Sequence, residues 1–309
     1  MTTWPALPLA AWEPTYQTLH LWTQILGKTR LALCPLQNHY WQAALYVSTR
    51  GLTTSPMPLS DGLLEIELDF ISHALIARTS DGSTETFSLE SMSVADFYRR
   101  YLRILHSLGA NVHLNEVPSE VADRTRFPDD TTHATYDADA AHRCWRILVE
   151  SDRVLAAYRA EFIGKSSPVH FWWGAFDLAC TRFSGRRAPL HPGGVPYLAD
   201  RVVREAYSHE CQSVGWWPGG GYGVVREPAV REPAYYAYAY PEPTGYSSAR
   251  VSPPEAYYHP TMLEWILPYD VVRTSKDPDA VLRAFCESTY DAAARLGSWD
   301  RSACERQAA

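Results

Sequence analysis

Lysine is scarce in this sequence. Of its 28 Lys and Arg residues only three are lysine, and acidic residues outnumber basic ones to give a net charge of −7. A protein that binds nucleic acid through its phosphates needs a basic face, so we expect no nucleic acid partner. No apolar run reaches the roughly 18 residues needed to cross a bilayer, so we expect no membrane partner either.

The sequence also shows no signal-peptide pattern at its start and no paired cysteines. Its start, Met1-Thr2-Thr3-Trp4-Pro5, has neither a basic residue nor an apolar run. The six cysteines form no C-x-x-C pair and show no zinc-site spacing, which is typical of buried thiols in a reducing compartment. We therefore predict a cytoplasmic protein without a metal site. Neither a cofactor nor an oligomeric state can be inferred.

Apolar periodicity predicts a mixture of helices and strands. A hairpin turn is expected at Ser80-Asp81-Gly82-Ser83, and Ser93 is expected to cap the helix that follows it. The sequence therefore predicts an α+β protein with a largely antiparallel sheet. Helices are expected at 14–26, 93–108, 137–163 and 277–296, and strands at 29–34, 40–49, 63–71, 73–79, 84–89, 169–183 and 261–272.

Short matches between distant segments indicate an internal repeat. Gly27-Lys28 and Gly164-Lys165 each follow a predicted helix, and each is followed by a His-aromatic-Trp sequence, at 39–41 and 170–172. Residues 64–70 likewise resemble residues 263–269. We predict one compact unit of residues 1–309 with two related helix–strands–helix halves. These halves span 12–109 and 137–299, with 110–136 as their connector.

The second half carries a Pro/Gly/Tyr-rich segment, 186–258, which we interpret as an irregular insertion. It contains the tandem pentapeptide Val-Arg-Glu-Pro-Ala at 225–229 and 230–234. Beyond that repeat, tyrosines 236, 238 and 240 alternate with alanines, as in a strand with one aromatic face.

The sequence resembles a bacterial protein family over nearly its whole length. The resemblance rests on Gly164-Lys165-Ser166-Ser167-Pro168-Val169-His170-Phe171-Trp172-Trp173-Gly174, on Asn38-His39-Tyr40-Trp41 and on Val94-Ala95-Asp96-Phe97-Tyr98. These segments are similar to a family of uncharacterised proteins, domain of unknown function 5996. The resemblance implies a self-contained bacterial protein and implies no activity.

The two His-aromatic-Trp segments are the best candidates for a site. Strand alternation predicts that His170, Trp172 and Arg182 share a face, with Asp177 on the other. Packing of the halves about a pseudo-twofold axis would bring His39 and Trp41 to the same place. The histidines would then act as general acid and base. The alternative is that these are core aromatics with hydrogen-bonded histidines.

Basic residues near these segments favour an anionic ligand. Lys28, Arg50, Lys165 and Arg182 would bind it, since ammonium and guanidinium groups neutralise carboxylates and phosphates. The alternative for both lysines is a structural place beside a glycine that ends a helix. A P-loop is excluded, because Arg159 stands where its first glycine is required. The row Glu65, Glu67, Asp69 is either a solvated strand face or a carboxylate set.

Two functions remain open. The first is a small-molecule binding protein or enzyme whose pocket lies between the halves and takes an organic anion. The second is a non-catalytic interaction module that uses the aromatic Pro/Tyr-rich segment. Convergence of the polar residues in a buried site favours the first, and a flat tyrosine surface favours the second.

Overall fold

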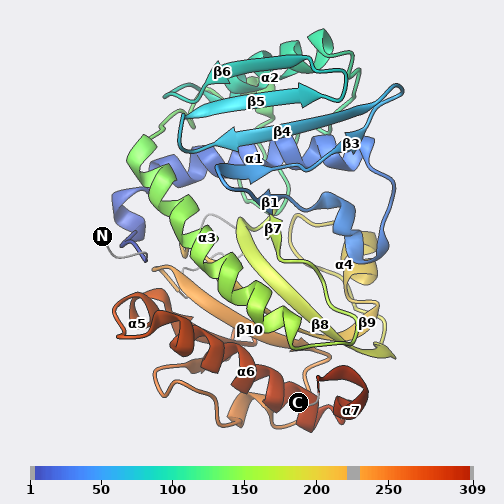
Figure 1. The fold of residues 1–309 in the computed structure, drawn as a ribbon, viewed down its shortest axis with the longest axis vertical. Coiled ribbons are helices and arrows are strands. Elements are labelled where there is room, and N and C mark those ends of the chain that lie inside the picture. Colours follow the sequence, from blue (N-terminus) through green and yellow to red (C-terminus); the bar gives the residue numbers. More distant parts are fainter. Residues whose placement is uncertain (1–3, 221–229, 307–309) are drawn as a thin grey trace.

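A computed structural model of the chain describes residues 4–220 and 230–306. It has two halves, each built from an antiparallel sheet and the helices that pack on it, one above the other in Figure 1. The predicted α+β class is therefore confirmed. The helices are α1 (Glu13–Leu33), α2 (Val94–Ser107), α3 (Ala138–Ala160), α4 (Asp200–Ala206), α5 (Tyr269–Arg273), α6 (Pro278–Leu296) and α7 (Arg301–Cys304).

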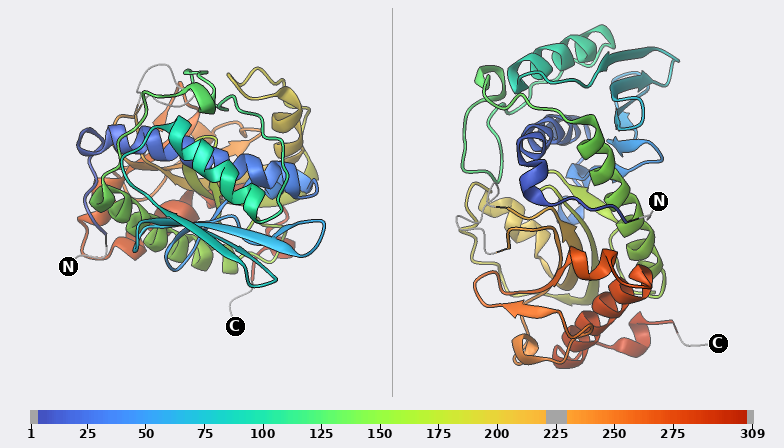
Figure 2. Two further views of the ribbon diagram at one scale, coloured as in Figure 1. Left: turned by 90° about the horizontal axis from the view of Figure 1, so that it is seen from above. Right: turned by 90° about the vertical axis from the view of Figure 1, so that its left-hand side faces the viewer.

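The first sheet is covered on one side by α1 and α2 (Figure 2). Alternation in its long strand buries Leu64, Ile66 and Leu68 in the core. Trp22 of α1 stacks on Phe97 of α2 with ring centroids 4.6 Å apart, which joins the two helices. The sheet order is β1-β2-β4-β5-β6, with β3 paired to β4. Its strands are β1 (Tyr46–Val47), β2 (Gly51–Thr53), β3 (Met57–Pro58), β4 (Leu63–Asp69), β5 (Ala74–Thr79) and β6 (Thr84–Ser88).

The second sheet has the order β11-β12-β10-β9-β8-β7 and packs one face against α3 and α6. Polar contacts help to fix this packing: the Tyr158 hydroxyl of α3 donates to Gln212 at 2.9 Å, and Ser151 lies 2.8 Å from the Tyr235 hydroxyl. The strands are β7 (His170–Trp172), β8 (Asp177–Arg187), β9 (His209–Trp217), β10 (Ala234–Tyr240), β11 (Tyr257–His259) and β12 (Glu264–Pro268).

The two sheets meet edge to edge at β1 and β7. Leu45 and Phe171 exchange reciprocal backbone hydrogen bonds of 2.9 and 2.8 Å. One continuous apolar core runs through both halves, from Trp22 in the first to Tyr290 in the second. The halves therefore share their interior.

Side chains cap the starts of two helices, and the cap at Ser93 was predicted. Ser93 accepts a hydrogen bond from the Asp96 amide at 3.1 Å at the start of α2. Asp137 accepts one from the Ala140 amide at 3.0 Å at the start of α3. Both satisfy amides that have no partner inside the helix.

The predicted end of the first helix is wrong. α1 continues through Gly27 and Lys28 to Leu33, so the expected strand at 29–34 is helical. Gly27 is instead required for packing, because a Cβ there would lie 2.0 Å from Trp173 Nε1. The expected strand at 40–49 is also shorter. Residues 38–43 form a 3-10 turn before β1.

The interpretation of 186–258 as an irregular insertion is wrong as well. It contributes β9 and β10, which lie in the middle of the second sheet. The alternating tyrosines do form a strand, β10, as predicted. The matched segments 64–70 and 263–269 fall in β4 and β12, which occupy different positions when each sheet is followed from the junction. Of the tandem pentapeptides, the first copy (225–229) lies outside the described residues.

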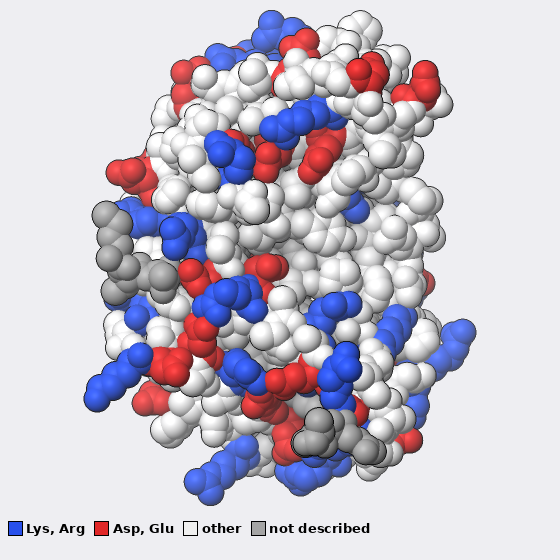
Figure 3. Space-filling view, in the orientation of Figure 1, with Lys and Arg blue, Asp and Glu red and all other residues white. Residues whose placement is uncertain are grey.

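None of the helices that the structure describes is long and apolar enough to span a membrane. On the face drawn in Figure 3, basic and acidic side chains are interspersed, most clearly over the lower half of the view. That face therefore carries no broad basic surface.

Candidate functional site

A cavity with two adjoining chambers lies between the halves. The larger has a volume of about 870 Å³ and is bounded by α1, by the connector and by residues 197–202. We call it the basic chamber. Its Asp, Glu, Lys and Arg residues in the described chain are one acid, Glu120, and three basic residues, Lys28, Arg124 and Arg201.

The smaller chamber, of about 350 Å³, lies over the face of the second sheet that α3 and α6 leave open. We call it the aromatic chamber, after Trp41, Trp172, Phe183, Tyr207, Trp217, Tyr236 and Tyr238 in its lining. The two chambers share Tyr40, Glu120, Trp172, Leu198 and Val202. Together they form one concave site with apolar walls and a few polar groups, as ligand sites usually do.

Strand pairing explains why the sheet is hollowed here. Ala179 of β8 pairs with Gly215 of β9, which pairs with Tyr236 of β10. A Cβ on Gly215 would lie 2.6 Å from the Tyr236 ring, so glycine lets this ring lie across β9. The small residues Ala179 of β8 and Gly215 of β9 thus lie beside the large Tyr236 of β10. This difference in side-chain size leaves the space that forms the aromatic chamber.

Three carboxyl groups face the aromatic chamber: Glu120, Asp177 and Glu264. Burial raises the pKa of Glu120 to about 7, and the nearby Asp177 adds to the increase. Burial likewise raises the pKa of Asp177 to about 7, although Tyr236 donates a hydrogen bond to its Oδ2. Burial and Asp177 raise the pKa of Glu264 to about 8. The three groups therefore exchange protons near neutral pH.

Residues with a strained backbone gather around this cavity. A left-handed φ costs a non-glycine residue about 1–3 kcal/mol and persists where the surroundings enforce it. Four such residues line the chambers, and two others directly precede Asp177 and Glu264. They are His39 (φ 57°), Tyr40 (59°), Glu120 (57°), Tyr197 (60°), Phe176 (56°) and Leu263 (59°). The fold thus holds the acidic side chains in place at an energetic cost.

Gly174 makes room for the Glu120 carboxyl between the chambers. A Cβ on Gly174 would lie 1.9 Å from Glu120 Oε1. We expect Gly174→Ala to displace this carboxyl and lower the free energy of unfolding by about 1 kcal/mol, measured by urea denaturation. In a Glu120→Ala background the same substitution should cost almost nothing. An equal cost in both backgrounds would show that another contact is responsible.

Lys28 is the buried cation of the basic chamber. It is 5% exposed, and its ammonium donates to Ser119 Oγ at 3.1 Å and lies 5.7 Å from the Trp173 ring. Burial and the neighbouring Arg124 lower its pKa to about 8, while Glu120 acts in the opposite direction. The charged ammonium therefore lacks a carboxylate hydrogen bond in the described chain, and an anionic ligand would stabilise it.

His39 and Lys165 form a second basic pair at the edge of the aromatic chamber. Lys165 Nζ lies 2.6 Å from His39 Nε2, and His39 Nδ1 lies 3.0 Å from the Ala206 carbonyl. An ammonium donates only, so the imidazole is neutral, with its proton on Nδ1. Burial and Lys165 accordingly lower the pKa of His39, and burial lowers that of Lys165. Of the predicted site residues, Lys28, His39, Trp41 and Trp172 line the cavity and Lys165 adjoins it.

The comparison with protein families gives one match. The model of a family of unknown function, DUF5996, matches residues 4–306. The chain belongs to this family. The resemblance noted in the sequence is thereby confirmed. No curated protein and no solved structure matches the chain. The chemistry of the site must therefore be derived from its own residues.

Arg182 and Asp177 lie on the opposite faces from those predicted. The turn of residues 173–176 pairs His170 with Ala179 and Trp172 with Asp177. Asp177 therefore shares the cavity face, whereas Arg182 points toward α3 and α6. Its guanidinium lies 3.4 Å from the centre of the Tyr158 ring, and only 3% of the residue is exposed.

His170 is enclosed behind the wall of the aromatic chamber. Its ring centroid lies 5.7 Å from that of Trp41 and 5.0 Å from that of Trp172, and the residue is 1% exposed. Neither ring nitrogen has a hydrogen-bond partner in the part of the chain that the structure describes. Burial, Arg30 and Arg159 lower its pKa to about 3. It does not meet His39 in a shared active site.

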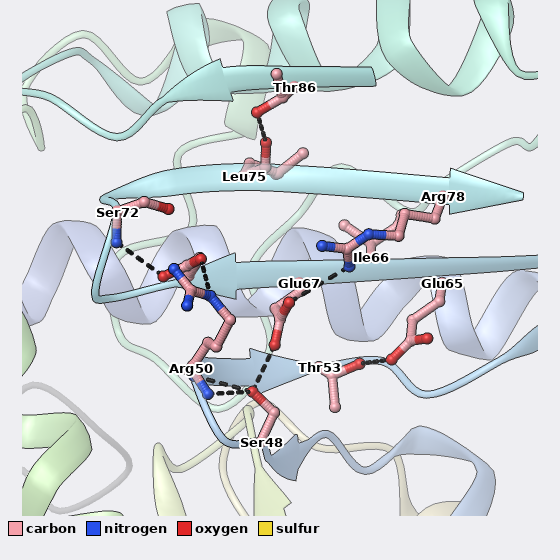
Figure 4. A network of polar contacts seen from close by, with 12 residues as sticks. Ser48, Arg50, Thr53, Glu65, Ile66, Glu67, Ser72, Leu75, Arg78 and Thr86 are labelled. Carbon is pink, nitrogen blue, oxygen red and sulfur yellow. Dashed lines mark hydrogen bonds and ion pairs between the residues drawn. The ribbon is translucent and has the colours of Figure 1, made fainter. Parts of the chain in front are cut away.

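Arg50 lies away from the cavity, on the outer face of the first sheet. Its Nε donates to Asp69 Oδ2 at 2.5 Å, beside Ser48, which donates to Glu67 at 2.5 Å (Figure 4). Glu65 accepts from Thr53 at 2.6 Å. The acidic row of β4 is thus neither a solvated face nor a free carboxylate set, because each carboxylate has a partner and Asp69 is fully buried.

The sequence analysis missed Glu120 and Glu264 and misplaced Asp177. These acids come from the connector, from β8 and from β12, and no local motif links them. The available signal was weak, namely isolated acids beside apolar or aromatic residues. Within residues 4–220 and 230–306, no group of three His, Cys, Asp or Glu residues could hold a metal ion.

Proposed function

We propose that this protein binds a small organic anion in the cavity between its halves, as a binding protein or as an enzyme. The observation that carries the proposal is the basic chamber. It brings Lys28, Arg124 and Arg201 to one cavity in a chain whose net charge is −7. A buried ammonium without a carboxylate hydrogen bond is costly, and a ligand carboxylate or phosphate offsets that cost.

If the ligand is turned over, Asp177 and Glu264 are the groups best suited to transfer protons. Their pKa values of about 7 and 8 are near a working pH, whereas the pKa values of His39 and His170 are lowered. This replaces the two histidines as the proposed acid and base. His39 keeps a place in the proposal as a wall residue that holds Lys165.

The alternative, an interaction module with an exposed aromatic surface, has less support. Tyr207, Trp217, Tyr236 and Tyr238 belong to the Pro/Gly/Tyr-rich segment, and all four line the aromatic chamber. Aromatic side chains that face a cavity favour a small ligand over a flat protein partner.

The first test is a ligand search. Native mass spectrometry of the purified protein, compared with its denatured mass, reveals a copurified compound. A panel of mono-, di- and tricarboxylates and phosphate esters is then screened by thermal shift, and the best compound is taken to calorimetry. Failure of every panel member to bind, together with an unliganded native mass, would contradict the proposal.

We expect Lys28→Met to weaken binding of the best anion by at least about tenfold, because a charge-assisted hydrogen bond is worth about 1.5–3 kcal/mol. Calorimetric titration measures the effect. Lys276→Met is the matched control, since Lys276 is exposed and outside both chambers. Equal affinity in the two variants would remove Lys28 from the site.

We further propose that the protein acts in the cytoplasm of a bacterium. All six cysteines are free thiols, and all but Cys34 are buried. Unpaired buried thiols are typical of proteins from reducing compartments. The resemblance of the sequence to a bacterial family supports the source, and fractionation of the native host tests the location.

A further inference from the structure

We infer that the aromatic chamber binds a cationic group, so that the ligand is a zwitterion with an ammonium at one end and a carboxylate or phosphate at the other. This inference rests on the proposed function for its anionic end only. The cationic end is argued from different residues, which lie in the second half of the chain.

The walls of the aromatic chamber suit an ammonium ion. The faces of Trp and Tyr rings attract cations, and several such rings form the cages that hold quaternary ammonium groups. Trp41, Trp172 and Trp217 line this chamber together with four tyrosines. Lys165 lies at the edge of the chamber, with its Nζ 5.5 Å from the Trp41 ring and 5.1 Å from the Phe183 ring. Among the described residues, no Lys or Arg belongs to the lining itself, and the rings of Trp172 and Trp217 are left for a ligand cation.

Glu264 supplies a carboxyl group without a partner, and a bound cation would favour its charged form. Its carboxylate faces the chamber, and it has no hydrogen bond or ion pair to any residue that the structure describes. Nearby Asp177 accepts a hydrogen bond from the Tyr236 hydroxyl, and no basic side chain of the described residues forms an ion pair with either acid. Two carboxyls in a confined space repel each other when both are ionised. A ligand cation between them removes that repulsion, whereas a neutral group does not.

The connection of the chambers gives the ligand its direction. Glu120 and Trp172 belong to both linings, so one molecule can extend from the basic chamber into the aromatic chamber past them. Its anionic end then lies near Lys28 and its cationic end near Glu264. The acidic and basic groups of the cavity are thus separated along the path of the ligand.

A homologous series of ω-trimethylammonio carboxylates tests the inference. Each member has a carbon isostere in which a tert-butyl group replaces the trimethylammonium group. The two compounds share shape and carboxylate and differ in one positive charge. Affinities are measured by calorimetry for the wild type, Glu264→Gln, Lys28→Met and the control Glu255→Gln, in which an exposed glutamate is changed.

We expect the best member of the series to bind at least about tenfold more tightly than its isostere. Glu264→Gln should reduce this preference and leave the affinity of the isostere nearly unchanged, and Glu255→Gln should change neither. Lys28→Met should weaken both compounds equally.

Each other outcome is decisive. Equal binding of the charged compound and its isostere would contradict a cation site in the aromatic chamber and would not affect the proposed anion site. A preference that survives Glu264→Gln would also contradict this cation site. Binding that depends on the ammonium but is unaffected by Lys28→Met would support the cationic end and contradict the proposed anion site. If no member of either series binds, the zwitterionic ligand is ruled out, and the anion site is decided by the panel of carboxylates and phosphate esters.

Discussion

Gly27→Ala should lower the free energy of unfolding by about 3 kcal/mol, measured by urea denaturation. The new Cβ would lie 2.0 Å from Trp173 Nε1. The indole cannot withdraw easily, because it is buried and donates to the Ala43 carbonyl at 2.7 Å. Alanine is favoured over glycine in a helix by only about 1 kcal/mol, so the clash dominates. Since Trp173 also lines the basic chamber, anion binding should weaken as well.

A smaller ring at position 173 provides the control. In a Trp173→Phe background the Gly27→Ala substitution should cost much less, because the atoms that meet the new Cβ are removed. If its cost is the same in both backgrounds, the contact between α1 and the turn after β7 is not the reason for the glycine.

The free energy of unfolding should fall as the pH rises from about 6.5 to about 8. Glu120, Asp177 and Glu264 have pKa values raised to about 7, 7 and 8, so the folded chain retains protons that the unfolded chain has lost. Their stabilising contribution is complete below the unfolded pKa values and is lost as the pH passes the folded ones. Each carboxyl contributes at most about 1.4 kcal/mol per pH unit.

The histidines do not reverse this trend in that range. The pKa values of His20 and His170 are lowered to about 4 and about 3, so their contribution is lost as the pH falls below 6.5. Lys28, with a pKa lowered to about 8, adds stability only as the pH rises beyond that value. His133, whose pKa is raised by its hydrogen bond to Asp130, also loses its stabilising contribution as the pH rises through this range. A substitution is therefore needed to assign the dependence to the acids of the cavity.

Glu264→Gln should flatten this dependence. The difference in unfolding free energy between the variant and the wild type should change in favour of the variant as the pH rises toward 8. Denaturant unfolding over a pH series measures it, with Glu255→Gln as the control at an exposed glutamate. A difference that does not vary with pH would mean that Glu264 titrates normally.

Several elements could be predicted because their signals are local. The hairpin between β5 and β6, the Ser93 and Asp137 caps and the helices α2, α3 and α6 follow from turn chemistry and apolar periodicity. β9 was missed because its sequence, His209–Trp217, has no regular alternation. It is buried on both faces as a central strand, and such strands lack a polar period.

The site was predicted only in part. The sequence pointed to Lys28, Trp41 and Trp172, which line the cavity, since rare lysines and repeated aromatic motifs can be recognised in isolation. It misplaced Arg182 and Asp177, because a turn between paired strands decides which residues share a face. The prediction continued the strand alternation through residues 173–176, which form a turn, and therefore placed the residues of β8 on the wrong faces.

By itself, the sequence determined the α+β class, the two halves and the family, because these depend on periodicity and motifs along the chain. Only the tertiary structure decided that Glu120, Asp177 and Glu264 meet in one aromatic chamber. They are separated by 57 and 87 positions in the chain and converge because the connector and the second sheet pack around one cavity. Their raised pKa values have the same origin, since burial and mutual repulsion arise only once the chain has folded.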